Sequence, residues 1–181
     1  MIAVLTTSSS IMLSLIALSL SLLLDLTWLT HTDELAQYTI AYPETWEKTM
    51  TEGYVTFLTA AKDSNDTFRE NVNVLIQDLT QQPTSMEQYT QITKDWILET
   101  GGPEGLISET NIQLSGLPAK EVMYKLPATA FDFTEPLLFY QVWIITPEKA
   151  FLLTYSGTIA EFDIHLENAK KTIHSFKLNK P

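Results

Sequence analysis

The chain has 181 residues, of which 45% are hydrophobic and 18% are charged, a composition typical of one globular domain. It carries 22 acidic residues against 11 basic ones, for a formal net charge of −11, and such a charge repels a nucleic-acid backbone. The absence of cysteine excludes disulfides, thiolate metal sites and cysteine nucleophiles. We therefore expect no nucleic-acid partner.

An apolar segment stands near the start of the chain. Residues 11–24 carry no charge, and after Asp25 the apolar character continues to Leu29. A helix over residues 11–29 would measure about 28 Å, close to the hydrocarbon thickness of a bilayer. This segment is predicted to contact the membrane as a retained anchor, or to be a cleaved signal; a buried amphipathic helix is the remaining alternative. Its apolar positions include Ile11, Leu15, Leu18, Leu22 and Leu29.

The charges around this segment do not define its orientation, because the first lysine or arginine of the whole chain is Lys48. Export signals in general carry a domain across a membrane, so we expect the extracytoplasmic side, with the domain anchored or secreted. We assign residues 1–36 to the signal or anchor segment and residues 37–181 to a folded domain.

Beyond residue 37 the apolar residues alternate, which predicts β-strands. Ser115-Gly116 and Pro147-Glu148 mark tight reversals, and strands joined by so few residues must be antiparallel. Residues 137–145 are apolar on both faces, which predicts a central strand covered from two sides. The seven predicted strands lie near residues 38–42, 55–57, 72–76, 106–114, 120–126, 137–145 and 150–157.

Two segments have helical spacing. In the first, Met86 opens a series of apolar residues spaced three or four apart, and the series ends before Gly101-Gly102. The second series runs from Phe162 to Phe176. Side chains placed for capping boxes precede both helices, namely Thr84 with Glu87 and Thr158 with Glu161.

This order of elements predicts an α+β fold. We expect an α-β-α sandwich with a central, mainly antiparallel sheet of about seven strands and two main helices, preceded by the N-terminal apolar helix. Trp46, Trp96 and Trp143 fall in three different elements, and we predict that they anchor the core rather than form a stacking platform.

A catalytic constellation is absent from the sequence. It contains no G-x-S-x-G, H-E-x-x-H, P-loop or G-x-G-x-x-G motif. Of its three histidines, His31 lies beside the apolar segment, whereas His165 and His174 are nine residues apart on the second predicted helix and point to different sides. We predict packing or surface roles for them and no enzymatic activity.

The most polar loop spans residues 62–70. Asp63, Asn65, Asp66 and Glu70 offer hard oxygen ligands there, which predicts a candidate calcium site. The loop departs from the EF-hand pattern, because Phe68 stands where the sharp turn needs glycine. The alternative is a solvated hairpin loop in which Asp and Asn side chains stabilise turns.

Three blocks of this sequence resemble the PsbP-like family. They are Y-T-I-A-Y-P at residues 38–43 followed by Trp46, E-N-V-N-V at residues 70–74 leading into Q-D-L, and A-K-K at residues 169–171 with Ser175-Phe176. The likeness covers about residues 37–178 and implies an α-β-α sandwich that binds or assembles other proteins rather than an enzyme.

The best-known members of that family are extrinsic subunits of photosystem II, associated with calcium and chloride retention at the oxygen-evolving centre. The resemblance therefore implies docking on a membrane protein complex, with an accessory or assembly role in the photosystem II oxygen-evolving complex as a candidate, in the periplasm or thylakoid lumen. Bacterial envelope relatives and a Ran-binding eukaryotic relative imply the alternative, an envelope protein of a non-photosynthetic bacterium that binds a small apolar ligand or another protein. No family metal ligand matches by position, so calcium rests on analogy of fold.

Overall fold

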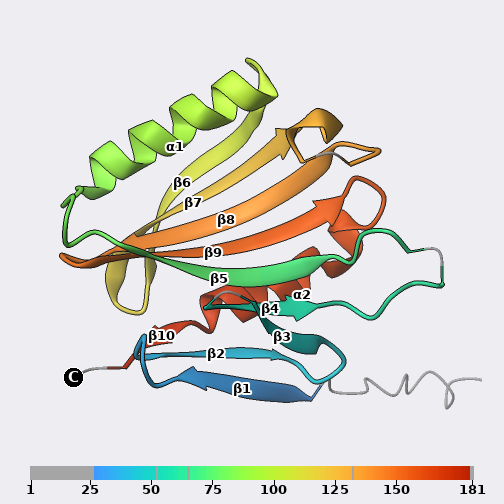
Figure 1. Ribbon diagram of the computed structural model, residues 1–181, viewed down its shortest axis with the longest axis horizontal. Coiled ribbons are helices and arrows are strands. Elements are labelled where there is room, and N and C mark those ends of the chain that lie inside the picture. Colours follow the sequence, from blue (N-terminus) through green and yellow to red (C-terminus); the bar gives the residue numbers. More distant parts are fainter. Residues whose placement is uncertain (1–26, 52, 65, 132, 180–181) are drawn as a thin grey trace, which may run out of the picture.

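The computed structural model describes residues 27–51, 53–64, 66–131 and 133–179, which form two antiparallel sheets and two α-helices (Figure 1). The predicted α+β class and α-β-α layering are confirmed. The smaller sheet has the order β1 (Trp28–Asp33), β2 (Tyr38–Pro43), β10 (Lys177–Leu178). The seven-stranded sheet has the order β3 (Glu47–Thr51), β4 (Tyr54–Leu58), β5 (Asn71–Asp78), β9 (Lys149–Thr158), β8 (Leu137–Ile145), β7 (Leu117–Leu126), β6 (Leu106–Leu114).

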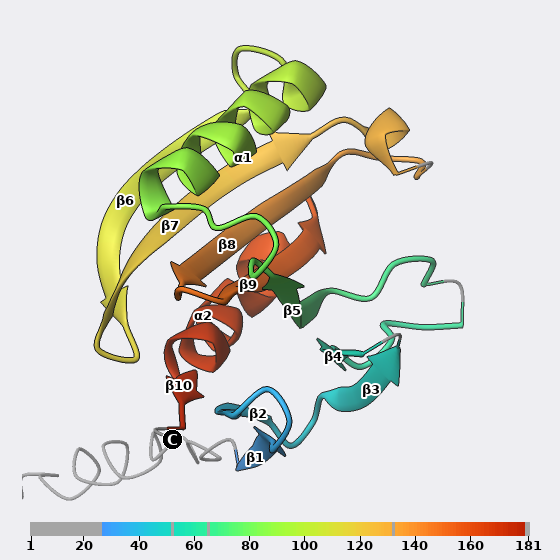
Figure 2. The same ribbon diagram turned by 60° about the vertical axis from the view of Figure 1, so that its left-hand side comes forward.

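The two helices cover opposite faces of the large sheet. Helix α1 (Met86–Gly101) lies over β6 and β7, whereas α2 (Phe162–His174) packs against β5 and β9 on the other face and also against β2 of the smaller sheet (Figures 1 and 2). Helix α2 therefore joins the two sheets. A short 3-10 helix, Ala128–Ala130, follows β7.

Strand β8 separates two hydrophobic cores, as its two apolar faces predict. Tyr140 and Val142 point into the core beneath α2, and Phe139 and Trp143 point into the core beneath α1. All four side chains are buried. Burial of each large apolar side chain contributes roughly 1.5–3 kcal/mol, so this strand is a main source of stability for both layers.

The smaller sheet changes two sequence-based expectations about the strands. The predicted strand 38–42 is β2, which pairs with β1 rather than with the large sheet. The position at the large sheet's edge is taken by β3, which the sequence pattern did not indicate. Most β3 side chains are exposed, so apolar and polar residues do not alternate there.

Strand β1 lies within the predicted signal or anchor segment 1–36, so the folded part begins before residue 37. Leu29 pairs with Tyr42 in the sheet, and the predicted apolar helix therefore does not extend to Leu29. The other predicted membrane positions lie outside the described residues. Among the described residues, we find no helix with both the length and the apolarity needed to cross a membrane. The predicted membrane positions that lie outside the described residues are Ile11, Leu15, Leu18 and Leu22.

The N-cap of helix α1 is Ser85, one residue after the predicted cap Thr84. The Ser85 hydroxyl accepts a hydrogen bond from the Gln88 backbone N–H at 3.2 Å, and the Gln88 side chain accepts from the Ser85 N–H at 3.1 Å. Thr84 instead donates to the Gln82 carbonyl. Gly102 follows the helix with a φ of 76°, which confirms that the glycine pair ends it.

The predicted capping box of α2 is wrong. Thr158 ends β9, and its hydroxyl donates to Glu70 Oε1 at 2.9 Å instead of capping the helix. Glu161 occupies the N-cap position without a side-chain cap hydrogen bond. A carboxylate from the loop before β5, far away in the sequence, thus accepts a hydrogen bond from the hydroxyl that local spacing had assigned to the helix.

The tryptophans divide between core and surface. Trp46 and Trp143 are buried as predicted, with 6% and 0% of their surface exposed. Trp96 on α1 contacts the ring of Tyr124 on β7 but remains 44% exposed, so its predicted role as a core anchor is wrong.

Candidate functional site

One candidate site, which we call the acidic pocket, lies where the loop between β4 and β5 meets the junction of β9 and α2. It has a volume of about 500 Å³. Three of the four predicted calcium ligands, Asp63, Asp66 and Glu70, line it, whereas Asn65 lies outside the described residues. The other charged side chains in its walls are Lys62, Glu135 and Glu161.

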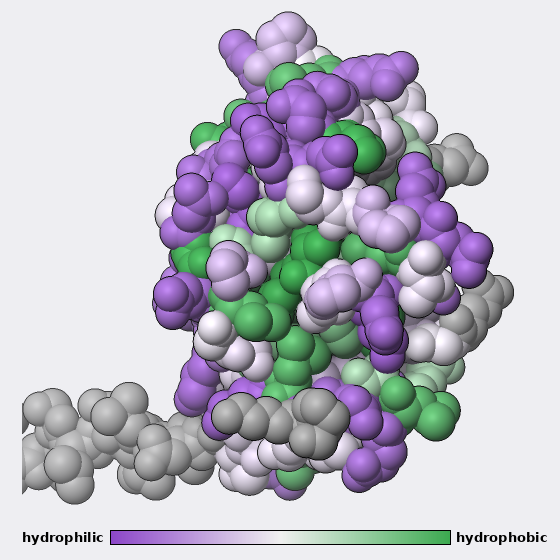
Figure 3. Space-filling view, turned by 90° about the vertical axis from the view of Figure 1, so that its left-hand side faces the viewer, coloured by the Kyte–Doolittle hydropathy of each residue, from purple (hydrophilic) through white to green (hydrophobic). Residues whose placement is uncertain are grey.

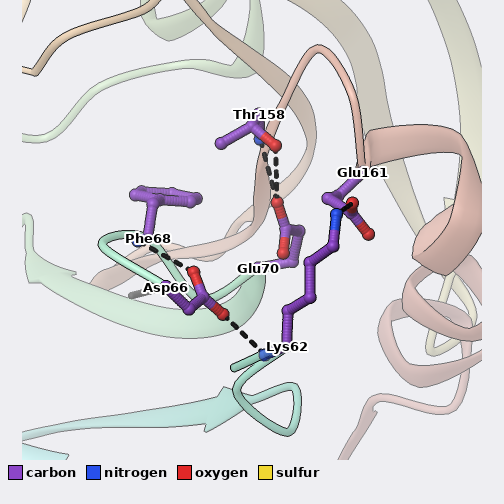
Figure 4. Close-up of polar contacts among 6 residues, drawn as sticks. All are labelled: Lys62, Asp66, Phe68, Glu70, Thr158 and Glu161. Carbon is purple, nitrogen blue, oxygen red and sulfur yellow. Dashed lines mark hydrogen bonds and ion pairs between the residues drawn. The ribbon is translucent and has the colours of Figure 1, made fainter. Parts of the chain in front are cut away.

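Glu70 is the buried anchor of this pocket, with only 3% of its surface exposed. Its Oε1 accepts hydrogen bonds from the Thr158 backbone N–H at 3.1 Å and from the Thr158 hydroxyl at 2.9 Å (Figure 4). A Cβ atom on Gly157 would lie 3.1 Å from Glu70 Cγ and from Phe162 Cδ2, so only glycine fits beside the carboxylate without displacement. These hydrogen bonds join the residue that precedes β5 to the end of β9, which is a structural role.

Asp66 organises the loop through its two carboxylate oxygens. Oδ2 accepts from the Lys62 N–H at 2.9 Å, and Oδ1 accepts from the Phe68 N–H at 3.1 Å. The Lys62 ammonium bonds to Glu161 across the pocket, which raises the pKa of Lys62 (Figure 4). This pattern agrees with the predicted alternative, a loop in which Asp side chains stabilise turns.

The described part of the chain contains no group of three or more His, Asp or Glu side chains placed to hold a metal ion. Two of the predicted ligands, Asp66 and Glu70, already accept hydrogen bonds from the protein. The structure therefore brings the described candidates to one pocket without converging them on one point, and calcium binding stays a prediction.

The three histidines lie in separate surroundings. His31 is buried between the rings of Tyr38 and Phe57, and burial lowers its pKa. His165 borders the acidic pocket, with its ring edge-on to Trp46.

His174 on α2 belongs to a cluster that sequence reasoning missed. Tyr140 on β8 donates its hydroxyl proton to Glu121 on β7 at 2.5 Å, and His174 Nε2 lies 2.8 Å from the same hydroxyl. Because the phenol has a single proton, His174 must be the donor in its contact with Tyr140. Burial and the Glu121 hydrogen bond raise the pKa of Tyr140, so the phenol stays protonated and links α2 to the sheet.

A second candidate site, which we call the apolar hollow, lies at the end of the molecule where three turns meet β10. Its volume is about 600 Å³. Apolar side chains gather in the middle of this face and polar ones surround them (Figure 3). The apolar lining residues are Ala36, Leu117, Pro147, Phe151 and Leu178.

Two residues with left-handed backbone line the hollow. Gln37 and Ser115, with φ of 60° and 55°, are the non-glycine residues with positive φ in the described chain. The Gln37 carbonyl accepts from the Asn179 N–H at 2.8 Å, and the Ser115 hydroxyl accepts from the Leu178 N–H at 2.8 Å. Leu178 of β10 and the following Asn179 thus hold the two turns in a conformation that costs about 1 kcal/mol per residue. The walls of the hollow are therefore preformed.

The sequence predicted two of the turns that line the hollow but not the hollow itself. The reversals at Ser115-Gly116 and Pro147-Glu148 are confirmed, and both border the hollow. These two turns lie beside the β1–β2 turn and β10 only because the two sheets pack together. The local sequence pattern of each turn does not indicate that the turns come together.

Comparisons with known proteins identify the fold. No family model matches the sequence, and no curated protein matches it. Among solved structures, the cyanobacterial PsbP protein CyanoP from Synechocystis sp. PCC 6803 is similar with a TM-score of 0.60 and 13% identity over 84% of this chain and 93% of that one.

Two further structures extend the likeness beyond cyanobacteria. LpqN of Mycobacterium tuberculosis, described as involved in cell envelope biogenesis, has a TM-score of 0.59 and 12% identity, covering 86% of both chains. The Ran-binding protein Mog1p of Saccharomyces cerevisiae has a TM-score of 0.57 and 9% identity, covering 84% of this chain and 96% of that one. The chain therefore has the PsbP-like fold.

Proposed function

We propose that this chain is a non-catalytic PsbP-type domain that works on the extracytoplasmic side of a membrane and docks on a membrane protein complex. Its N-terminal apolar segment supplies the tether or the export signal. The fold it shares with CyanoP and with LpqN, which is described as involved in cell envelope biogenesis, supports this assignment. The observation that carries the docking proposal is the preformed apolar hollow.

The hollow has the features of a docking surface. A concave apolar centre with a polar rim is the arrangement found in specific protein interfaces, where apolar groups lose water and the rim provides hydrogen bonds. Because β10 holds the turns at Gln37 and Ser115, little conformational entropy is lost when a partner binds. An apolar side chain of the partner fits this geometry.

The partner that the sequence resemblance implies is the photosystem II oxygen-evolving complex, where the domain acts as an accessory or assembly protein. In a non-photosynthetic host the same surface serves another envelope complex. Recovery of photosystem II subunits with the chain would assign the first role, and recovery of a different membrane complex would assign the second.

Co-purification from detergent-solubilised membranes tests the docking. Pro147→Asp places a charge at the exposed rim of the hollow, and we expect it to abolish recovery of the partner. Ile107→Asp is the matched control, since Ile107 is 51% exposed at the opposite end of the β6–β7 hairpin. Recovery of the wild-type chain alone, or equal recovery of the partner by both variants, would contradict the proposal.

A second candidate function is the carriage of a small apolar ligand. A volume of about 600 Å³ falls within the range of small-molecule sites, roughly 300–1,000 Å³. Native mass spectrometry of the chain purified from its host should then show a retained ligand, and Leu117→Trp should displace it by filling the hollow. A wild-type mass equal to the mass of the polypeptide excludes this function.

A further inference from the structure

The apolar segment joins the folded domain at a fixed point. Trp28 is the first residue of β1. The carbonyl of the preceding residue, Thr27, accepts a hydrogen bond from the Glu44 N–H at 2.9 Å, which fixes the start of the domain. The uninterrupted apolar run ends at Leu24. Four residue steps span at most about 14 Å, so a membrane-inserted run would hold Trp28 close to the headgroup layer.

Trp28 is paired with a lysine at this junction. Lys171 of α2 places its ammonium nitrogen 4.2 Å from the centre of the Trp28 ring, within the range of a cation–π contact. Indole rings and lysine side chains are the groups that gather at the boundary between membrane and water, because each combines an apolar body with a polar end. Trp28 and Lys171 therefore place at this junction two side chains of the types that favour the boundary between membrane and water.

Basic side chains extend from this pair along the end of α2. Lys170, Lys171 and His174 lie in its last two turns, and Lys177 follows in β10. Within the described part of the chain, no salt bridge engages Lys171 or Lys177. In a chain of net charge −11, these lysines offer an anionic partner a local positive charge.

Carboxylates on or beside these elements differ in their contacts. Glu167 is 3.5 Å from the Lys170 ammonium, and Glu121 accepts the Tyr140 hydroxyl, so these two have partners in the protein. Glu44 lies beside Thr27 and is exposed.

We propose that Trp28 and the basic end of α2 form a membrane-facing surface that binds anionic lipid headgroups. The inference rests on the membrane tether of the proposed function, which brings this surface to the bilayer. Helix α1 covers the opposite face of the large sheet from α2, and it therefore points away from the membrane (Figures 1 and 2).

Depth-dependent quenching in vesicles tests this orientation. The chain has no cysteine, so Thr30→Cys in β1 and Ile92→Cys in α1 each accept one fluorescent label at an exposed position. The full chain is reconstituted in vesicles of phosphatidylcholine, alone or with one part in four of phosphatidylglycerol, each containing a headgroup spin-label quencher. We expect strong quenching at residue 30, weak quenching at residue 92, and a larger difference in the anionic vesicles.

Charge removal tests the lipid chemistry. Lys171→Gln should lower the equilibrium constant for holding the domain against anionic vesicles roughly fivefold, since each juxtamembrane lysine contributes about that factor. Lys125→Gln is the matched control, because Lys125 is an exposed lysine on β7. Equal effects of the two substitutions, or equal quenching in the two lipid compositions, would overturn the binding of anionic headgroups.

Flotation separates this inference from the tether on which it rests. A chain that does not float with either vesicle overturns both. A chain that floats but shows equal quenching at residues 30 and 92 overturns the orientation and leaves the tether intact. Shielding of residue 30 only in the presence of a co-purified complex assigns the surface to a protein partner instead, which also overturns the inference.

Discussion

Replacement of Glu70 by alanine is expected to destabilise the fold strongly. Both the backbone N–H and the hydroxyl of Thr158 donate to Glu70 Oε1, and Thr158 is only 8% exposed. The substitution leaves two buried donors without this acceptor, at a cost of about 1–3 kcal/mol each. We therefore expect the free energy of unfolding to fall by roughly 2–6 kcal/mol.

The isosteric variant separates the hydrogen bonds from the charge. Glu70→Gln keeps an oxygen that can accept from Thr158, so it loses only the extra strength of a charged acceptor, about 1–2 kcal/mol. Glu135→Ala serves as control, because Glu135 is an exposed carboxylate of the same pocket. Its removal should change stability by less than about 0.5 kcal/mol.

Urea unfolding of the full chain in mild detergent, followed by tryptophan fluorescence, measures these differences. The expected order of stability is wild type and Glu135→Ala, then Glu70→Gln, then Glu70→Ala. If Glu70→Ala proves as stable as Glu135→Ala, the structural role of Glu70 is refuted and the carboxylate becomes available for another function.

Two further predictions concern calcium and pH. Calorimetry with calcium should detect at most weak binding, because Asp66 and Glu70 already accept protein hydrogen bonds; a submicromolar dissociation constant would contradict this. Burial first, and then the Lys48 charge, lower the pKa of His31 below its ordinary value of 6.5, an effect that Asp33 opposes. Below pH 6.5 the unfolded chain therefore binds more protons than the folded chain, and stability decreases as the pH falls. His31→Phe should flatten this decrease in unfolding measurements from about pH 7 to about pH 5, and an unchanged slope would count against it.

Elements with a strong local pattern were predictable from the sequence. The nine residues of β8 alternate between two buried faces, and both cores are assigned correctly by that alternation. Helix α1 also has the expected extent, although its cap shifts from Thr84 to Ser85. The shift arises because Ser85 and Gln88 satisfy the same capping pattern, and spacing alone does not choose between neighbouring hydroxyls.

Elements at the edges of the fold were not predictable in the same way. Strand β3 is a mostly exposed edge strand, so it has no apolar alternation to reveal it. Trp28 and Leu29 continue an apolar run by composition, and only their pairing with Pro43 and Tyr42 assigns them to a sheet. Trp96 shows the reverse, because its helical spacing suggested burial and the structure leaves 44% of its surface exposed.

By itself, the sequence determined the class of the fold, the antiparallel reversals and the absence of familiar catalytic motifs, since these depend on residues close together in the chain. Tertiary structure alone decided that Glu70 meets Thr158, that three turns enclose the apolar hollow, and that Lys171 rests on Trp28. Each of these contacts joins residues that are far apart in the chain. Their proximity follows from how the sheets and α2 pack, which local propensity does not encode.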